Sequence, residues 1–267
     1  MHHKGNLMVI GGAEDKAGEC KILKQFIECA EHGNIVVMTS ATEKPEQVGK
    51  DYAEIFMRLG AAKVEVLDIP NRQIANQARI CEALNQAQGI FFTGGDQLKI
   101  TGILGGTMAD TVLHSRYAAG TIIAGTSAGA SVMSSTMIVG GASDETPAKD
   151  ALSMAPGMGL IGDVVIDQHF AQRGRIGRLL SAVAQNPHYL GIGIDEDTAV
   201  LIDEMGCFRV IGSQTVTVVD GQPIAFTNVS ETGTRHPLAL FNVVLHVLPA
   251  EFSFDLRQRR PILPGRE

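Results

Sequence analysis

Residues 120–130 read Gly-Thr-Ile-Ile-Ala-Gly-Thr-Ser-Ala-Gly-Ala. The apolar residues 122–124 predict a buried strand, and the small residues after Ser127 can enter a helix at once. Gly-x-Ser-x-Gly at a strand-to-helix turn is the pattern of a nucleophile elbow, in which the glycines permit a tight turn. Ser127 is thus a candidate nucleophile, and the N–H of Ala128 points where an oxyanion would form. The alternative is that the small residues only let a helix pack closely against a strand.

Strands alternate with helices along the first 130 residues. This order predicts an α/β fold of three layers, a mostly parallel sheet with helices on both faces. Right-handed crossovers follow from that arrangement. The predicted strands are 6–10, 35–39, 64–67, 89–92 and 122–124, and the predicted helices are 20–30, 45–59, 74–87 and 107–117.

The later part of the chain has a different pattern. Residues 5–197 form the predicted parallel core, and closely spaced apolar runs over 198–248 predict an antiparallel extension of the same sheet. The tail, 249–267, contains arginines among prolines and is interpreted as a poorly packed terminus. We interpret all 267 residues as one domain.

Three glycine turns follow predicted strands: Gly11-Gly12, Gly94-Gly95-Asp96-Gln97 and Gly125-Thr126-Ser127. Because ligands of open α/β sheets gather at the carboxyl ends of the strands, we expect these turns to meet at one site. A backbone N–H of Gly94-Gly95 can supply a second oxyanion donor, and a plain turn is the alternative. The first turn superficially resembles a phosphate loop, but the third glycine is missing and an acidic pair follows.

A serine nucleophile needs a base, and usually a carboxylate that fixes the tautomer of the base. His169 is the candidate base because, of the histidines, it alone ends an apolar strand-like run. Asp195, Glu196 and Asp197 end another such run and are the candidate orienters, a solvated acid cluster being the alternative. The order serine, histidine, acid differs from that of the α/β-hydrolases. Either a later histidine is the base, or a different fold carries a convergent elbow.

The composition argues against several classes of protein. The chain has 22 Lys and Arg against 29 Asp and Glu, a net charge of −7, which disfavours binding to nucleic acid or an anionic membrane. Its four cysteines are scattered without a Cys-x-x-Cys pair, so we predict neither a metal site nor a disulfide framework. No apolar run has the roughly 18–20 residues that cross a bilayer, and no secretory signal pattern precedes Leu7. We therefore expect a cytoplasmic protein.

Five motifs, in this order, resemble those of the cyanophycinases, which are serine exopeptidases related to aspartyl dipeptidase. The motifs are Gly-Gly-Ala-Glu-Asp-Lys at 11–16, Gly-Gly-Asp-Gln at 94–97, Gly-Thr-Ser-Ala-Gly-Ala at 125–130, Asp-Gln-His-Phe at 167–170 and Gly-Ile-Asp-Glu-Asp-Thr-Ala at 193–199. The resemblance covers residues 7 to about 220 and implies a fold similar to that of the class I glutamine amidotransferases.

The resemblance implies Ser127 as nucleophile, His169 as base and Glu196 as acid. It also implies that the substrate and partner is cyanophycin, a polyaspartate whose side-chain carboxyls carry arginine, and that the product is β-aspartyl-arginine. We expect an acyl-enzyme without metal or cofactor, with the N–H groups of Gly95 and Ala128 holding the oxyanion. An α-aspartyl dipeptidase and a non-catalytic nucleotide-binding domain are the alternatives, and a homodimer is left open.

The substrate chemistry predicts which side chains bind it. Each arginyl branch carries a carboxylate and a guanidinium, so the site needs cations and carboxylates. Arg173, Arg175 and Arg178 follow His169 closely, and an arginine can grip a carboxylate in bidentate geometry. The other candidates are Gln97, to orient the backbone amide, and Asp144, Glu145 and Asp167, to bind the guanidinium.

Overall fold

The structure is a computed structural model of the chain, and it describes residues 5–141, 146–149 and 151–264. Within these residues nine strands form a main sheet: Leu7–Ile10 (β1), Asn34–Met38 (β2), Lys63–Leu67 (β3), Gly89–Phe92 (β4), Ile122–Thr126 (β5), Thr198–Ile202 (β10), Cys207–Gly212 (β11), Ser253–Asp255 (β16) and Arg260–Ile262 (β17). Their order across the sheet is β17-β16-β11-β10-β1-β5-β4-β2-β3.

The main sheet has a parallel half and an antiparallel half. Strands β1, β5, β4, β2 and β3 pair in parallel, which places their carboxyl ends along one edge. Strand β10 lies antiparallel to β1, and β11, β16 and β17 continue in that sense. The predicted α/β class is confirmed, with a sheet that is mixed.

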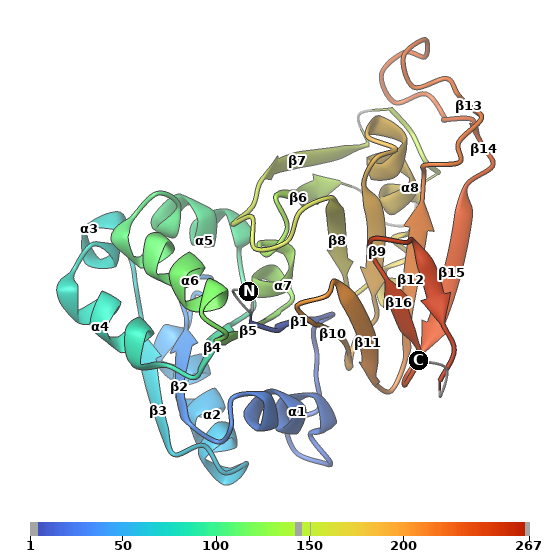
Figure 1. Cartoon of the computed structure of the whole chain (residues 1–267). Coiled ribbons are helices and arrows are strands. Elements are labelled where there is room, and N and C mark those ends of the chain that lie inside the picture. Colours follow the sequence, from blue (N-terminus) through green and yellow to red (C-terminus); the bar gives the residue numbers. More distant parts are fainter. Residues whose placement is uncertain (1–4, 142–145, 150, 265–267) are drawn as a thin grey trace.

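Helices cover both faces of the parallel half (Figure 1). One face carries Lys21–Cys29 (α1) and Pro45–Arg58 (α2), and the other carries Arg72–Ala75 (α3), Ala78–Gln86 (α4), Gln97–Leu104 (α5) and Met108–Ala118 (α6). The alternation of side chains along a strand explains this arrangement: Leu7 and Val9 of β1 enter one core, whereas Met8 and Ile10 enter the other. Among the described helices we find none with the length and apolar character of a membrane span.

A second sheet packs against the antiparallel half of the main sheet. It contains Val164–Gln168 (β8), Leu190–Ile194 (β9), Thr215–Asp220 (β12) and Val244–Pro249 (β15), in the order β15-β12-β9-β8. The prediction that 198–248 only extends the main sheet is therefore wrong for β12 and β15, and β8 and β9 also leave that sheet. The reason is that Ile192 and Val218 share one apolar core with Val200, so the two sheets lie face to face.

The remaining elements are short connections and one covering helix. Helix α8 (Ile176–Gln185) packs Leu179 and Val183 against Val219, on the face of the second sheet that points away from the main sheet. The others are Ala128–Ser131 (α7), Ala171–Arg173 (a 3-10 turn, η1) and the paired strands Thr136–Gly141 (β6) with Leu152–Pro156 (β7) and Phe226–Thr227 (β13) with Leu240–Phe241 (β14).

The C-terminal segment belongs to the main sheet, so the prediction of a poorly packed tail is wrong. Phe254 in β16 is fully buried and stacks on Phe208 in β11, with ring centroids 5.6 Å apart. Arg259 also bonds to the Asp220 carboxylate at 2.6 Å. A distant strand offers an apolar partner here, and burial of the two rings outweighs the poor local strand propensity of the segment.

We expect Phe254→Ala to lower the free energy of unfolding by about 3–5 kcal/mol, because it leaves a cavity beneath Phe208. Urea denaturation measures this change. Phe241→Ala is the matched control, since that ring is 58% exposed and its loss should cost far less. Equal destabilisation by the two substitutions would contradict the packing of the C-terminal strands.

Candidate active site

Ser127 lies in the sharp turn between β5 and α7, with φ 53° and ψ −109°. A non-glycine residue at positive φ is uncommon and is kept only where its surroundings fix it. The two glycines around it are required by close packing, because a Cβ on Gly125 would lie 2.3 Å from the Gly129 carbonyl oxygen and one on Gly129 would lie 2.5 Å from that of Phe92. The backbone thus has the geometry of a nucleophile elbow.

Three side chains predicted from the sequence are in hydrogen-bond contact. Ser127 Oγ lies 3.0 Å from His169 Nε2, and His169 Nδ1 lies 2.6 Å from Glu196 Oε1. His169 follows β8 and Glu196 follows β9, so two neighbouring strands of the second sheet bring base and carboxylate to the elbow. With Nδ1–H donating to Glu196, Nε2 is free to accept the serine proton.

Burial has the largest influence on the pKa of His169 and lowers it below the ordinary value of about 6.5. The hydrogen bond to Glu196 opposes this shift, whereas the positive charge of Arg173 adds to it. A lowered pKa means that the neutral ring predominates near neutral pH. His169 is therefore in the protonation state that a general base requires.

The turn after β1 holds the backbone of Ser127, of His169 and of the residue after Glu196. The carbonyls of residues 10–12 accept, in that order, the backbone N–H groups of Ser127, His169 and Asp197, at 3.1, 2.8 and 2.9 Å. These three donors all have positive φ, at 53°, 48° and 48°. Gly12 itself has φ 100°, and a Cβ there would lie 2.3 Å from His169 Cε1, so only glycine fits beneath the ring. The residues of this turn thus have a structural task.

The acids on either side of Glu196 have other partners. Asp195 is buried and accepts hydrogen bonds from Ala171 N–H at 2.9 Å and from the Thr215 hydroxyl at 2.8 Å. Asp197 accepts from the Asp15 N–H at 2.9 Å. Of the three candidate orienters, Glu196 is the one whose carboxylate contacts His169.

The predicted oxyanion donors lie beside the serine. A Cβ on Gly94 would be 3.5 Å from Ser127 Cβ, which places the β4 turn next to the elbow. Gly95 has φ 142°, and a Cβ there would lie 2.1 Å from the Ala41 carbonyl oxygen, so this position also requires glycine. Within the described residues, the N–H groups of Gly95 and Ala128 have no backbone acceptor.

Two of the predicted substrate-binding arginines are buried against Asp167. Arg178 donates from Nε to Asp167 Oδ2 at 2.9 Å and from Nη2 to Oδ1, and Arg175 donates to Oδ1 at 3.2 Å. All three side chains are at most 8% exposed, and Arg175 also bonds to the Gln168 carbonyl. Burial lowers the pKa of Arg175 to about 10, which still leaves it charged at neutral pH. The sequence shows these charges but not that they neutralise one another.

The other recognition candidates are placed differently. Arg173 is exposed on η1, close enough for its charge to affect His169. Gln97 begins α5 and donates from Nε2 to the Ile138 carbonyl at 3.0 Å. Asp144 and Glu145 lie outside the described residues.

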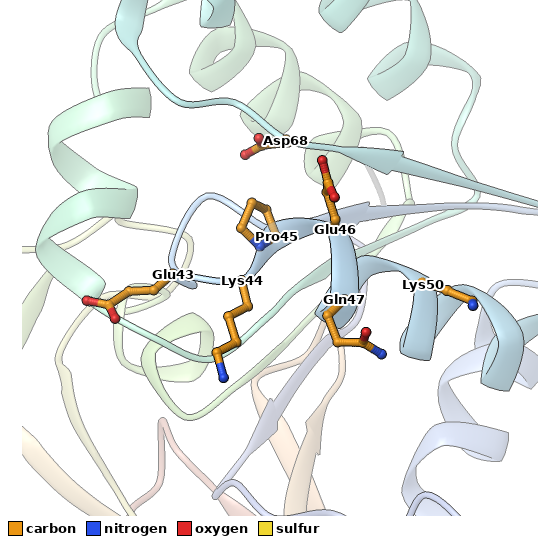
Figure 2. Close-up of a pocket in the computed structure, with 7 residues that line it drawn as sticks. All are labelled: Glu43, Lys44, Pro45, Glu46, Gln47, Lys50 and Asp68. Carbon is orange, nitrogen blue, oxygen red and sulfur yellow. The ribbon is translucent and has the colours of Figure 1, made fainter.

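A separate pocket opens at the carboxyl ends of β2 and β3. Figure 2 shows that the side chains of Glu43, Lys44 and Lys50 point away from one another, so they do not converge on one ligand. The residues that line this pocket are Glu43, Lys44, Pro45, Glu46, Gln47, Lys50 and Asp68. In the part of the chain that is described, we also find no group of three or more His, Cys, Asp or Glu side chains that could hold a metal ion.

The model of peptidase family S51 matches residues 7–210. The chain belongs to peptidase family S51. The matched segment contains Ser127, His169 and Glu196, so the contacts among these three side chains lie within it.

Curated cyanophycinases are similar to the chain over nearly its full length. A cyanophycinase from Trichormus variabilis (strain ATCC 29413 / PCC 7937) is 43% identical over 265 residues, which are 98% of this chain and 89% of the relative. One from Geminocystis herdmanii (strain PCC 6308) is 40% identical over 262 residues, covering 97% and 96%. The resemblance seen in the five motifs is confirmed.

Solved structures with low sequence identity share the fold. A peptidase from an acI-B1 Actinobacterium gives a TM-score of 0.66 at 22% identity, over 90% of this chain and 98% of that chain. A putative peptidase E from Listeria monocytogenes EGD-e gives 0.53 at 21% identity, over 78% and 97%. At this identity the likeness concerns the architecture alone.

We expect Arg178→Ala to destabilise the fold by about 3–5 kcal/mol, because it leaves the Asp167 carboxylate buried with half of its partners removed. Urea denaturation gives this value. Arg173→Ala is the control, since that side chain is exposed and its loss should change stability little. A stable Arg178→Ala variant with only a raised KM would instead show that Arg178 serves the substrate directly.

Proposed function

We propose that this serine peptidase of family S51 hydrolyses cyanophycin to β-aspartyl-arginine through an acyl-enzyme. The observation that carries the proposal is the relay from Ser127 through His169 to Glu196, with contacts of 3.0 and 2.6 Å. The similarity of nearly the whole chain to cyanophycinases supports the choice of substrate.

In the first half of the reaction, Ser127 Oγ attacks the backbone carbonyl of an aspartyl unit while His169 Nε2 takes the hydroxyl proton. Glu196 stabilises the imidazolium that forms. The N–H groups of Gly95 and Ala128 bind the oxygen on which negative charge develops. The tetrahedral intermediate collapses, the peptide C–N bond breaks, and the leaving amine takes the proton from His169.

In the second half, a water molecule replaces the amine. His169 takes a proton from the water as it attacks the ester between Ser127 and the aspartyl unit. The ester bond then breaks, the proton returns to Ser127 Oγ, and the product leaves as a free carboxylic acid. The enzyme is restored without a net change in its protonation.

Recognition of the arginyl branch uses fewer side chains than the sequence predicts. Arg173, exposed near His169, is the cation that we assign to a substrate carboxylate. Arg175 and Arg178 are assigned instead to holding Asp167, two residues before the base. Gln97, oriented by Ile138, has a side-chain carbonyl that can accept a hydrogen bond from a substrate amide.

The scaffold is assigned to the class I glutamine amidotransferase-like folds, in which an elbow nucleophile lies at the carboxyl edge of a parallel sheet. One apolar core shared by the two sheets supports a single domain. The cytoplasmic location and the homodimer stay predictions.

The direct test is incubation with cyanophycin, followed by identification of the soluble products by mass. We expect β-aspartyl-arginine, and a loss of about 10³-fold or more in Ser127→Ala and His169→Ala, because members of a relay act as a unit. Glu196→Gln should lower kcat more than Asp195→Asn, since only Glu196 contacts His169.

Retention of full activity in Ser127→Ala would contradict the serine mechanism. Equal rates on plain polyaspartate and cyanophycin would show that the enzyme does not recognise the arginyl branch, and would favour a broader aspartyl peptidase. A greater loss in Asp195→Asn than in Glu196→Gln would contradict the choice of orienter.

A further inference from the structure

Glu14 is a buried carboxylate that the catalytic steps above do not use. It lies in the turn after β1, and its side chain is 1% exposed. Thr126 donates from Oγ1 to Glu14 Oε2 at 2.6 Å, and Tyr52 donates its hydroxyl to Oε1. Lys16 Nζ lies 3.7 Å from Oε1 and 4.3 Å from the centroid of the Tyr52 ring. Nothing in the local sequence marks Glu14 as part of such a network.

The chemistry of this network fits an ionised carboxylate. Each oxygen of Glu14 accepts a hydroxyl donor, and Lys16 supplies the opposite charge, which together offset the cost of burying an ion. Burial raises the pKa of Tyr52 well above its ordinary value, with the charge of Glu14 as the next cause, so the phenol keeps its proton and acts as a donor. The position of Glu14 is therefore fixed from both sides.

The network ends on the residue that precedes the nucleophile. Thr126 is the last residue of β5 and is buried, and the strained turn at Ser127 follows it directly. A rotation of the peptide unit between Thr126 and Ser127 would move the Ser127 hydroxyl away from His169, because this rigid plane carries the Cα of Ser127. A displacement of about 1 Å of a reacting group is enough to slow catalysis strongly.

We propose that Glu14 is a positioning residue, which holds Thr126 through the 2.6 Å hydrogen bond and so keeps Ser127 Oγ in line with His169. This inference rests on the proposed function, since it assumes that Ser127 is the nucleophile. It assigns to the motif at 11–16 a second task beside its carbonyl contacts, the fixing of the residue before the serine.

A purely structural network is the alternative, and the two can be separated at Thr126. Thr126→Val removes the hydroxyl with little change of shape, and Thr126→Ser restores it. We expect Thr126→Val to lower kcat on a short soluble cyanophycin fragment by about 10-fold or more, with KM changed by about twofold or less, as for an interaction that acts on the reacting group. Thr126→Ser should keep kcat within about threefold of the unmodified enzyme. Glu14→Gln should lower kcat in the same way, and combining it with Thr126→Val should add little.

The rate at which a fluorophosphonate modifies Ser127, read as an increase in mass, gives the same comparison without any peptide substrate. It should fall in Thr126→Val and recover in Thr126→Ser. Thr39→Val is the matched control, because Thr39 is also a buried threonine at the end of a strand, with its hydroxyl on the Leu67 carbonyl. It should leave kcat and the modification rate unchanged.

Three results would overturn the positioning role. One is a Thr126→Val variant that keeps both kcat and the modification rate. Another is a similar loss of both rates in Thr39→Val, scaled to the change in its urea midpoint. The third is a Thr126→Ser variant that does not recover the rates lost in Thr126→Val. A failure of the proposed function appears differently, as fluorophosphonate modification at a residue other than Ser127 or as cleavage by Ser127→Ala.

Discussion

Three consecutive carbonyls, those of residues 10–12, hold the proposed nucleophile, the proposed base and the residue after Glu196 in one frame. They accept the N–H groups of Ser127 and His169, which directly follow β5 and β8, and of Asp197, which lies between β9 and β10. Because β5 belongs to the main sheet and β8 to the second sheet, this turn connects the two sheets beside the proposed relay. All three donors have positive φ, so the frame also stabilises backbone conformations that are unfavourable alone.

Much of this site was predictable because its signals are local. A Gly-x-Ser-x-Gly pattern at the end of an apolar strand identifies Ser127, and polar residues at the ends of apolar runs identify His169 and the acids near Glu196. The choice of Glu196 within its acidic triplet depended on family resemblance. Backbone direction at Asp197, which has φ 48°, is a feature that no local pattern specifies. The choice therefore needed coordinates or relatives.

The parts that sequence reasoning placed wrongly depend on non-local contacts. An apolar strand such as β12 has the same sequence pattern whether it joins the main sheet or packs across from it. Its place in the second sheet follows from the core that it shares with Val200. The same holds for Phe254, whose partner Phe208 lies far away in the chain. The pairing of Arg178 with Asp167 is also invisible in the sequence, where a charge near the active site and a charge buried against a carboxylate look alike. Its substrate-binding role stays a prediction.

The frame at residues 10–12 is tested most directly by Gly12→Ala, because a Cβ there would lie 2.3 Å from His169 Cε1. Gly120→Ala is the matched control, with φ 102° against 100° but no neighbouring atom within 4 Å. In an assay of cyanophycin hydrolysis, the kcat of Gly12→Ala should fall by about 100-fold or more, because the displaced ring no longer reaches Ser127. Its unfolding should stay as cooperative as that of Gly120→Ala. Unimpaired hydrolysis by Gly12→Ala would contradict the account.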